Sequence, residues 1–415
     1  MQEKASFPAI RFAGFTDAWE QRKLGEIGST YTGLAGKTKE DFGHGSGRFV
    51  TYMNVFTNTV SDAAAVEPIE IDNAQNEVKY GDVFFTTSSE TPEEVGMSSI
   101  WLETSENTYL NSFCFGFRPT ERFDPYYLAY MLRSDDIRKK ITFLAQGISR
   151  YNISKSKMMD IEIPVAKEDE QRLLGAFFRH LDHLITLHQR RYLQLCNFKK
   201  SMLEKMFPKE GADVPEIRFA GFRSAWKPYT LGEMSKSFEY GLNAAATTFD
   251  GKNKYIRITD IDDETRLFLT SDITSPAVDL NSAENYQLRE NDIVFARTGA
   301  SVGKTYIYKS FDGIMYYAGF LIRARIRPEY CAEFVFQNTL TERYKKFIYI
   351  TSQRSGQPGV NAQEYSTFEF PVPDYEEQRQ ISRFFYSLDH LITLHQRKLD
   401  RLQNIKKACL EKMFV

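Results

Sequence analysis

The chain has 415 residues, which is more than one ordinary hydrophobic core accommodates and suits two domains with connecting segments. Its hydrophobic content of 42% and charged content of 26% are typical of globular proteins, and no apolar stretch approaches the roughly 18 residues that a membrane helix needs. The net charge is −2, and acidic residues outnumber basic ones in both 1–164 and 210–374, so no general positive field surrounds these parts of the chain. Any DNA-binding face therefore has to be a local patch.

The N-terminus and the cysteines both predict a cytoplasmic protein. Residues 1–19 lack the charged and then apolar layout of a signal peptide. The cysteines form no CxxC pair and do not recur at matching places, so we interpret them as small buried residues in a reducing compartment. They are Cys114, Cys196, Cys331 and Cys409.

Several short motifs occur twice along the chain, and each pair is separated by the same 207 residues. They are RFAGF at positions 11 and 218, LGE at 24 and 231, LDHLITLHQR at 181 and 388, and LEKMF at 203 and 410. A constant offset over such a length indicates two copies of one plan. The plan divides the chain into a first lobe at 1–164, a long helix at 165–209, a second lobe at 210–374 and a second long helix at 375–415.

The two lobes share little sequence and are predicted to be mixed α/β domains. Residues 82–85 (DVFF) are similar to 292–295 (DIVF), and Gly96 parallels Gly303. Runs rich in β-branched and aromatic residues, bounded by Gly, Asn or Asp, predict strands. They lie at 82–87, 113–117, 292–296 and 315–326, while residues 125–133 and 332–347 are expected to be helices.

The two long helices are predicted to form an antiparallel two-helix coiled coil. From Leu174 and again from Ile381, apolar or semi-polar residues recur at alternating steps of four and three for about five heptads. Each helix follows prolines and a group of acidic residues, which complement the helix dipole. We expect the two seams to pack on each other, and packing against another chain is the alternative. The seam residues are Leu181, Ile185, His188, Leu195, Leu388, Ile392, His395 and Leu402.

The repeated motifs resemble those of the specificity subunits of type I restriction-modification systems. The resemblance covers essentially the whole chain and rests on two features of each half. One is the opening pattern RFAGF-x3-W-x4-LGE. The other is the run of proline, acidic residues and Glu-Gln-Arg (170–172 and 377–379) that leads into LDHLI.

That resemblance implies two target-recognition domains, each of which reads half of an asymmetric, interrupted site in double-stranded DNA. It also implies two methyltransferase subunits docked on the helices and two restriction subunits in the full complex. S-adenosylmethionine, ATP and Mg²⁺ would then belong to these partners. The chain itself is expected to hold no cofactor and to be no enzyme.

The second lobe contains a glycine-rich turn at Gly299–Thr305 (GASVGKT) that is similar to a phosphate-binding P-loop. It has three residues between its glycines where a P-loop has four, and it continues into a strand-like TYIY rather than a helix. We therefore favour a turn that meets DNA, and an ordinary hairpin turn is the alternative. The candidate donors to phosphates or base edges are Arg297, Thr298, Ser301 and Lys304.

A second polar loop occurs in both halves, at 146–152 and at 353–359, just ahead of the segment that leads to a long helix. Arginine can pair with guanine and Gln or Asn with adenine, so such loops are reasonable base readers. The alternative is a solvated turn. The candidates are Arg150, Tyr151, Asn152, Arg354 and Gln357.

No catalytic or metal constellation is repeated in the two halves. His183 and His188 are five residues apart and so lie on different faces of a helix, and we expect no metal site there. His188 and His395, with Lys199 and Lys406, are instead interpreted as polar seam residues that set the register. A duplicated hydrolase and a coiled-coil scaffold without DNA specificity are the competing interpretations.

Overall fold

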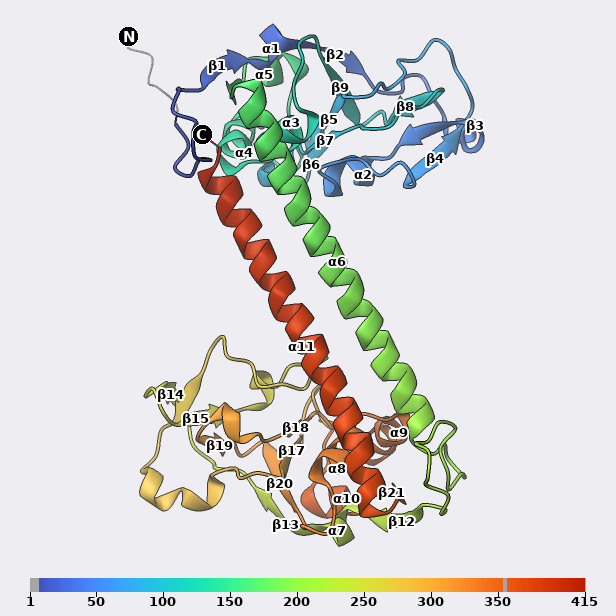
Figure 1. Ribbon diagram of the computed structural model, residues 1–415, viewed down its shortest axis with the longest axis vertical. Coiled ribbons are helices and arrows are strands. Elements are labelled where there is room, and N and C mark those ends of the chain that lie inside the picture. Colours follow the sequence, from blue (N-terminus) through green and yellow to red (C-terminus); the bar gives the residue numbers. More distant parts are fainter. Residues whose placement is uncertain (1–6, 354–356, 415) are drawn as a thin grey trace. The chain divides into compact units, whose positions relative to one another are not determined.

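The computed structural model describes residues 7–353 and 357–414, and the chain forms two compact units. The first unit comprises Met1–His188 with Lys398–Val415, and the second comprises Gln189–Arg397. Each unit contains one lobe and one part of each long helix (Figure 1). The two units are described separately below.

The first unit is built on an antiparallel four-stranded sheet in the order β2-β9-β5-β7. Smaller sheets pair β4-β3-β8, β6-β10 and β1-β11. The strands are β1 Glu20–Lys23, β2 Gly28–Thr32, β3 Phe42–Val50, β4 Val66–Ile69, β5 Val83–Thr86, β6 Ser88–Ser89, β7 Ser98–Ile100, β8 Thr108–Leu110, β9 Cys114–Pro119, β10 Tyr151–Asn152 and β11 Glu162–Val165. The helices of the lobe are α1 Leu24–Ile27, α2 Tyr52–Thr57, α3 Pro125–Met131, α4 Asp135–Leu144 and α5 Lys155–Met159.

The second unit repeats this plan with an antiparallel four-stranded sheet in the order β13-β20-β17-β18. Smaller sheets pair β12-β21, β14-β16 and β15-β19. The strands are β12 Lys227–Thr230, β13 Ser235–Tyr240, β14 Ala246–Thr248, β15 Lys254–Ile256, β16 Thr274–Pro276, β17 Asp292–Ala296, β18 Thr305–Ile307, β19 Met315–Tyr317, β20 Leu321–Ile326 and β21 Glu369–Val372. The helices of the lobe are α7 Leu231–Met234, α8 Ala332–Asn338, α9 Glu342–Thr351 and α10 Ala362–Ser366.

The predicted fold class is confirmed, and two of the predicted lobe elements are wrong in detail. The single strand predicted for 315–326 is two strands, β19 and β20, with Ala318–Phe320 between them. The single helix predicted for 332–347 is two helices, α8 and α9. The break occurs because the Thr341 hydroxyl donates to the Asn338 carbonyl and accepts a hydrogen bond from the Tyr344 N–H, which ends one helix and caps the next.

The long helices are α6 Glu168–Met206 and α11 Tyr375–Lys412, and within each unit they pack on each other in opposite directions. In the first unit the Lys406 ammonium lies 2.6 Å from the Asp182 carboxylate. In the second unit Lys199 makes the equivalent 2.6 Å contact with Asp389. These lysines therefore bridge the seam as charged partners. Of the eight seam residues, Leu181, Leu388 and Ile392 are buried, and Ile185, His188, Leu195, His395 and Leu402 are half-buried.

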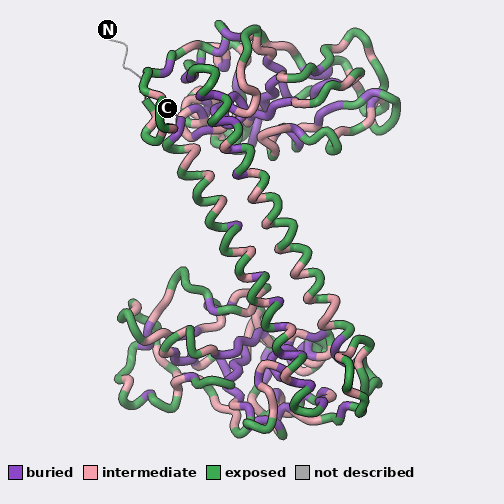
Figure 2. Tube along the Cα trace, in the orientation of Figure 1, coloured by how far each residue is buried: buried purple, intermediate pink, exposed green. Residues whose placement is uncertain are grey.

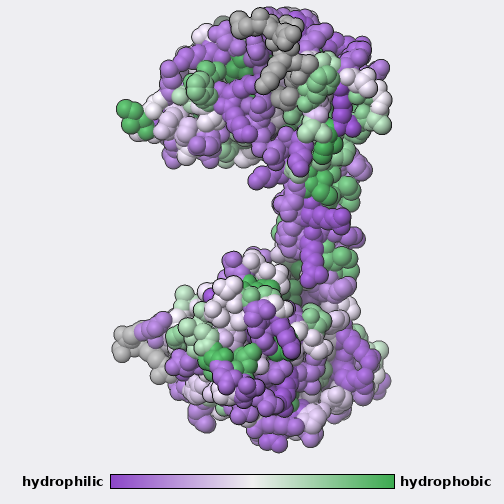
Figure 3. Space-filling view, turned by 90° about the vertical axis from the view of Figure 1, so that its left-hand side faces the viewer, coloured by the Kyte–Doolittle hydropathy of each residue, from purple (hydrophilic) through white to green (hydrophobic). Residues whose placement is uncertain are grey.

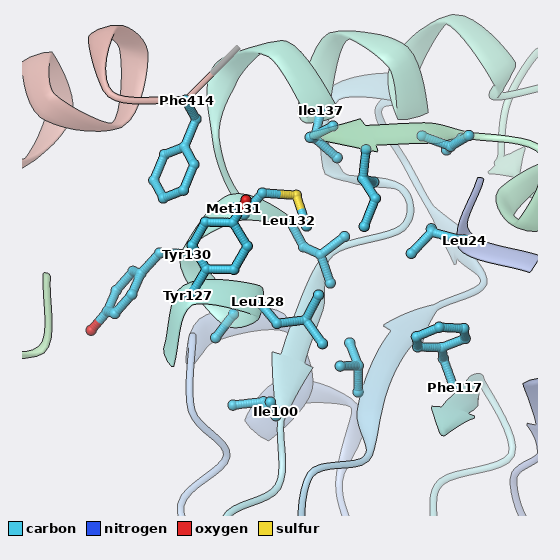
Figure 4. Packing of buried hydrophobic residues seen from close by; sticks show 14 of the residues in the cluster. Leu24, Ile100, Phe117, Tyr127, Leu128, Tyr130, Met131, Leu132, Ile137 and Phe414 are labelled. Atoms are coloured by element: carbon cyan, nitrogen blue, oxygen red, sulfur yellow. The ribbon is translucent and has the colours of Figure 1, made fainter. Parts of the chain in front are cut away.

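The repeated motifs meet in the core of each unit, where buried positions concentrate (Figure 2). In the first unit Phe414 from the last LEKMF motif stacks on Phe178, with ring centres 5.5 Å apart, and also contacts Tyr127 (Figure 4). In the second unit Phe207 from the first LEKMF motif contacts the equivalent residues Phe385 and Phe334, and it stacks on Phe334. The end of each long helix is thus a part of a unit's hydrophobic core.

A buried ion pair ties the opening motif of each half to the start of a long helix. The guanidinium of Arg11 donates two hydrogen bonds of 2.6 and 2.7 Å to Glu170, whose side chain is 1% exposed. Arg218 donates two bonds of 2.7 Å to Glu377, which is equally buried. The indole N–H of Trp19 also donates to Glu170 at 2.9 Å. The indole nitrogen of its counterpart Trp226 is buried and has no acceptor among the described residues.

The neighbouring glutamine of each Glu-Gln-Arg motif holds the first helix of the lobe. Gln171 accepts a hydrogen bond from the Asp124 N–H just before α3, and its amide donates to the Ala166 carbonyl. Gln378 accepts from the Cys331 N–H just before α8 and donates to the Pro373 carbonyl. Within residues 7–353 and 357–414, no helix is both long enough and apolar enough to span a membrane.

We predict that Arg218→Met lowers the free energy of unfolding by about 3 kcal/mol, because it leaves the Glu377 carboxylate buried without its partner. Arg11→Met should have a smaller effect, since Trp19 still donates to Glu170. The measurement is urea unfolding of the full chain followed by tryptophan fluorescence. Arg172→Met, which removes an exposed arginine beside Asp169, is the control. If Arg11→Met and Arg218→Met lower the free energy of unfolding by the same small amount, the burial of Glu377 does not depend on its pairing with Arg218.

Candidate nucleic-acid interface

Three segments of the second unit meet at the end of β17. The N–H of Arg297, the residue after this strand, donates to the Phe320 carbonyl at 3.1 Å. The Arg297 carbonyl accepts from the Val360 N–H at 2.9 Å, and Thr298 forms a β-bridge with Gly359. The two polar loops singled out from the sequence are therefore joined by main-chain hydrogen bonds at one end of the sheet.

The Arg297 side chain lies against two aromatic rings. Its guanidinium carbon lies 5.1 Å from the ring centre of Tyr240 and 5.9 Å from that of Phe320. The Nε atom is buried and has no acceptor among the described residues. Stacking on two rings restricts the rotamers of this arginine, so its donor groups are positioned before a ligand arrives.

Thr298 and Gln357 lie beside this arginine in the main-chain network. Thr298 is half-buried, Gln357 is exposed, and the Gly299 N–H donates to the Pro358 carbonyl at 3.0 Å. A Cβ built on Gly299 would lie 3.2 Å from the Gln357 amide nitrogen, and the φ of +79° also favours glycine. Arg354, the remaining candidate of this loop, lies outside the described residues.

Ser301 and Lys304 have different neighbours from Arg297. Lys304 is 7% exposed, and its ammonium donates to the Ile261 carbonyl at 3.1 Å and lies 2.5 Å from the Asp263 carboxylate. Both residues line a cavity of about 780 Å³ together with Arg266, whose pKa is lowered by burial. The Lys304 ammonium is therefore already paired within the lobe.

The turn at Gly299–Thr305 does not fit a nucleotide phosphate. It continues into the strand β18, as expected from the sequence, whereas a P-loop opens a helix whose N–H groups cradle the phosphates. Gly303 has a φ of +83°, and a Cβ there would lie 2.8 Å from the Ile348 side chain of α9. Its matched residue Gly96 has a φ of +63° and lies equally close to Ile141 of α4. Both glycines therefore permit close packing of a turn against a helix.

In each unit, main-chain hydrogen bonds join the residue after the central strand to a phenylalanine carbonyl and to the segment that follows the polar loop. We call this arrangement the main-chain frame, and the first unit has it with different side chains. The Thr87 N–H donates to the Phe113 carbonyl at 3.0 Å, and the Thr87 carbonyl accepts from the Ile153 N–H at 3.1 Å. Two hydrogen bonds of 3.0 and 2.8 Å between Gln146 and Asn152 close the polar loop. Arg150 and Asn152 are exposed, while Tyr151 is half-buried and packs against the core. The accessible polar candidates of this loop are therefore Arg150 and Asn152.

A half-buried arginine anchors a neighbouring turn of the first unit. Arg138 of α4 donates to the carbonyls of Gly96, Glu93 and Val95 at 2.6–2.7 Å. Burial lowers the pKa of Arg138 to about 10, which leaves it protonated at neutral pH. Its counterpart in the second unit, Lys345, instead pairs with Glu342 on its own helix. The turn that lies beside the polar loop is thus held by different contacts in each unit.

Three aromatic residues of this frame were not singled out from the sequence. Tyr240 and Phe320 stack on Arg297, and Phe113 occupies the position equivalent to Phe320. A signal was present, because Phe113 and Phe320 are 207 residues apart, at the offset of the repeated motifs. In the described part of the chain, no three His, Cys, Asp or Glu residues come together as metal ligands.

Comparison with known proteins gives consistent matches along the whole chain. Residues 16–197 and 223–404 each match the family model of the type I restriction modification DNA specificity domain. The type I restriction enzyme MjaVIII specificity subunit of Methanocaldococcus jannaschii is 22% identical over 374 residues, which are 86% of this chain and 84% of the relative. The StySPI specificity subunit of Salmonella potsdam is 22% identical over 391 residues, 89% of this chain and 79% of the relative.

Solved structures match in fold. The type I restriction-modification S subunit from M. genitalium superposes with a TM-score of 0.62 at 15% identity, covering 98% of this chain and 99% of the other. A chain from a type I restriction-modification complex superposes with a TM-score of 0.52 at 19% identity, covering 94% of this chain and 96% of the other.

We predict that Arg297→Ala removes base preference at one position of the DNA sequence that the protein selects from a random duplex library. Loss of one bidentate base contact should weaken binding of the original sequence by about 1–3 kcal/mol. Arg289→Ala is the matched control, because Arg289 is an exposed arginine at the other end of β17. If the Arg297→Ala variant selects the same sequence with the same base preferences, Arg297 is not a base reader and this loop is an ordinary turn.

Proposed function

The chain belongs to the family of type I restriction modification DNA specificity domains, and from this premise we propose how it reads its target. It is a DNA sequence-specificity subunit of a type I restriction-modification complex. We propose that each unit reads one half of an asymmetric, interrupted site in double-stranded DNA. The proposal places the reading groups in the polar loops at 146–152 and 353–359 and in the turn that begins at Arg297.

One observation carries this proposal: the main-chain frame is the same in both units, and the side chains on it differ. At the end of β17 stands Arg297, and at the equivalent point after β5 stands Thr87. Tyr240, which lies against Arg297, corresponds to Thr32 in the first half, because Tyr240 pairs with Ile322 and Thr32 pairs with Phe115, 207 residues earlier. Donor groups of different number and geometry recognise different base edges. Two readers built on one frame are therefore suited to two different half-sites.

We further propose that two methyltransferase subunits dock on the repeated helices. The decapeptide LDHLITLHQR occurs once in each long helix, so the same surface is presented twice. Its leucines Leu187 and Leu394 are 53% and 38% exposed, although both lie on long helices. Exposed apolar residues at matched positions favour two copies of one partner. Two restriction subunits would complete the assembly, which acts on DNA in the cytoplasm.

Catalysis belongs to those partners in this proposal, together with S-adenosylmethionine, ATP and Mg²⁺. The turn at Gly299–Thr305 supports this division, because its strand continuation and the pairing of Lys304 with Asp263 do not fit nucleotide binding. A duplicated hydrolase would be expected to keep one polar constellation in both units, whereas Thr87 and Arg297 differ. A scaffold without DNA specificity would not need two different sets of polar side chains on one frame.

The test is methylome sequencing of cells that express this chain with its methyltransferase subunit. We predict one methylated motif with two unequal specified parts and an unspecified gap, because the two readers carry different side chains. Cells with the methyltransferase subunit alone are the control and should lack the motif. A palindromic or uninterrupted motif would refute the proposal of two different readers.

We also predict that the readers can be exchanged separately. Replacing residues 27–160 with the equivalent segment of a relative should change one specified part of the motif and leave the other intact. The ion pairs of Glu170 and Glu377, the contact between Phe414 and Phe178 and the contacts of Phe207 lie outside the exchanged segment, so the second unit and the long helices should stay folded. A folded chimera that loses both specified parts would contradict this modularity.

A further inference from the structure

One phenylalanine stands exposed at the same point of each unit. Phe113 immediately precedes β9 and is 56% exposed, and Phe320 immediately precedes β20 and is 61% exposed. The next aromatic residues in the first unit, Phe115 and Phe117, are fully buried. The visible surface of each unit is mostly hydrophilic with separate apolar patches (Figure 3). An exposed phenylalanine at a matched point of both units therefore calls for a physical reason.

Each of these phenylalanines belongs to the main-chain frame of the candidate reading loops. The Phe113 carbonyl accepts from Thr87 at 3.0 Å, and the Phe320 carbonyl accepts from Arg297 at 3.1 Å. Thr87 and Arg297 are in turn bonded to the segment that follows the polar loop of their unit. Each exposed ring is therefore attached to the part of the lobe that we propose faces DNA.

The polar residue beside the phenylalanine differs between the units, while the phenylalanine does not. In the second unit the Arg297 guanidinium lies over the Phe320 ring at 5.9 Å. In the first unit the Thr87 hydroxyl donates to the Phe113 carbonyl at 2.8 Å. Contact with an arginine therefore does not explain why both units have the phenylalanine, because only the second unit has an arginine there.

A residue that reads one base should change when the sequence that is read changes. A residue that contacts what every DNA sequence shares should stay the same. Every nucleotide presents a deoxyribose, and every base has an apolar face that a side chain can contact where a base step is partly unstacked. A purely structural role is less able to account for the phenylalanines, because more than half of each residue is accessible and so contributes little to the lobe's core.

We propose that Phe113 and Phe320 are matched apolar contacts to duplex DNA, which pack against sugar and base surfaces whatever sequence their lobe reads. This inference rests on the proposed function, since it takes double-stranded DNA as the ligand of both units. It adds a contact that supplies affinity without specificity, beside polar loops that supply specificity.

The experiment measures binding of two duplexes by the complex with its methyltransferase subunits. One duplex carries the methylated motif and the other a scrambled motif. Phe113→Ala should weaken binding of both duplexes by the same factor, about five- to tenfold, because the lost apolar contact is independent of sequence. The dependence of affinity on salt should keep its slope, since no phosphate contact is removed. Phe320→Ala should weaken binding of the scrambled duplex by a similar factor and binding of the motif duplex further, because Phe320 also positions Arg297. On the scrambled duplex the two factors should multiply in the double variant.

Two further variants separate DNA contact from folding. Phe311→Ala removes a phenylalanine that is 73% exposed and lies in the 3-10 turn Ser310–Asp312, after the end of β18 that is remote from Arg297. It should leave both affinities unchanged. Phe320→Leu keeps an apolar side chain and should retain most of the affinity. Thermal unfolding of each variant checks that the second unit remains folded.

The possible outcomes distinguish this inference from the proposed function. Unchanged affinity of Phe113→Ala and Phe320→Ala for both duplexes would overturn the inference and leave the proposed function standing. A loss confined to the motif duplex would also overturn it, because the phenylalanines would then be base readers. A wild-type complex that does not distinguish the duplexes would refute the proposed function, while an equal loss by the alanine variants would still support the DNA contact.

Discussion

The buried arginine–glutamate ion pair at the start of each long helix is the contact on which the rest of each unit depends. Glu170 and Glu377 are almost wholly buried. An unpaired charge inside the protein would be strongly unfavourable. Each is compensated by an arginine that comes from the opening motif 159 residues earlier in the chain. A two-bond arginine–carboxylate pair has one favourable geometry. The opening segment, the helix start and the lobe between them are thereby fixed to one another.

This constraint explains which residues recur at the offset of 207. The arginine and glutamate of the buried ion pair, the glutamine that holds α3 or α8, and the aspartate that pairs with a lysine across the helices make the same contacts in both halves. The phenylalanines that end the two LEKMF motifs, Phe207 and Phe414, recur for the same reason. Phe414 completes the core of the first unit and Phe207 that of the second. Segments that are far apart in sequence are repeated because they touch.

The repeats and the periodicity of the helices were sufficient to predict the architecture from the sequence, whereas local contacts within the lobes were not. Strands β5 and β17 were predictable because their apolar runs are bounded by turn residues. The break between α8 and α9 depends on the hydroxyl of Thr341, which competes with the helical pattern around it. The pairing of Lys304 with Asp263 joins two loops that are 41 residues apart, and no spacing rule encodes it.

The separation of frame from loops also explains why the reading residues could diverge without loss of the fold. Arg150, Asn152 and Gln357 are exposed, and substitutions at exposed loop positions change stability little. The hydrogen bonds that position these loops run between main-chain atoms, such as Arg297 to Phe320 and Thr87 to Phe113, and are independent of the side chain. A new side chain therefore inherits the position of the old one. Specificity can therefore change one residue at a time, because the fold is stabilised elsewhere, by the buried arginine–glutamate pairs and the aromatic core.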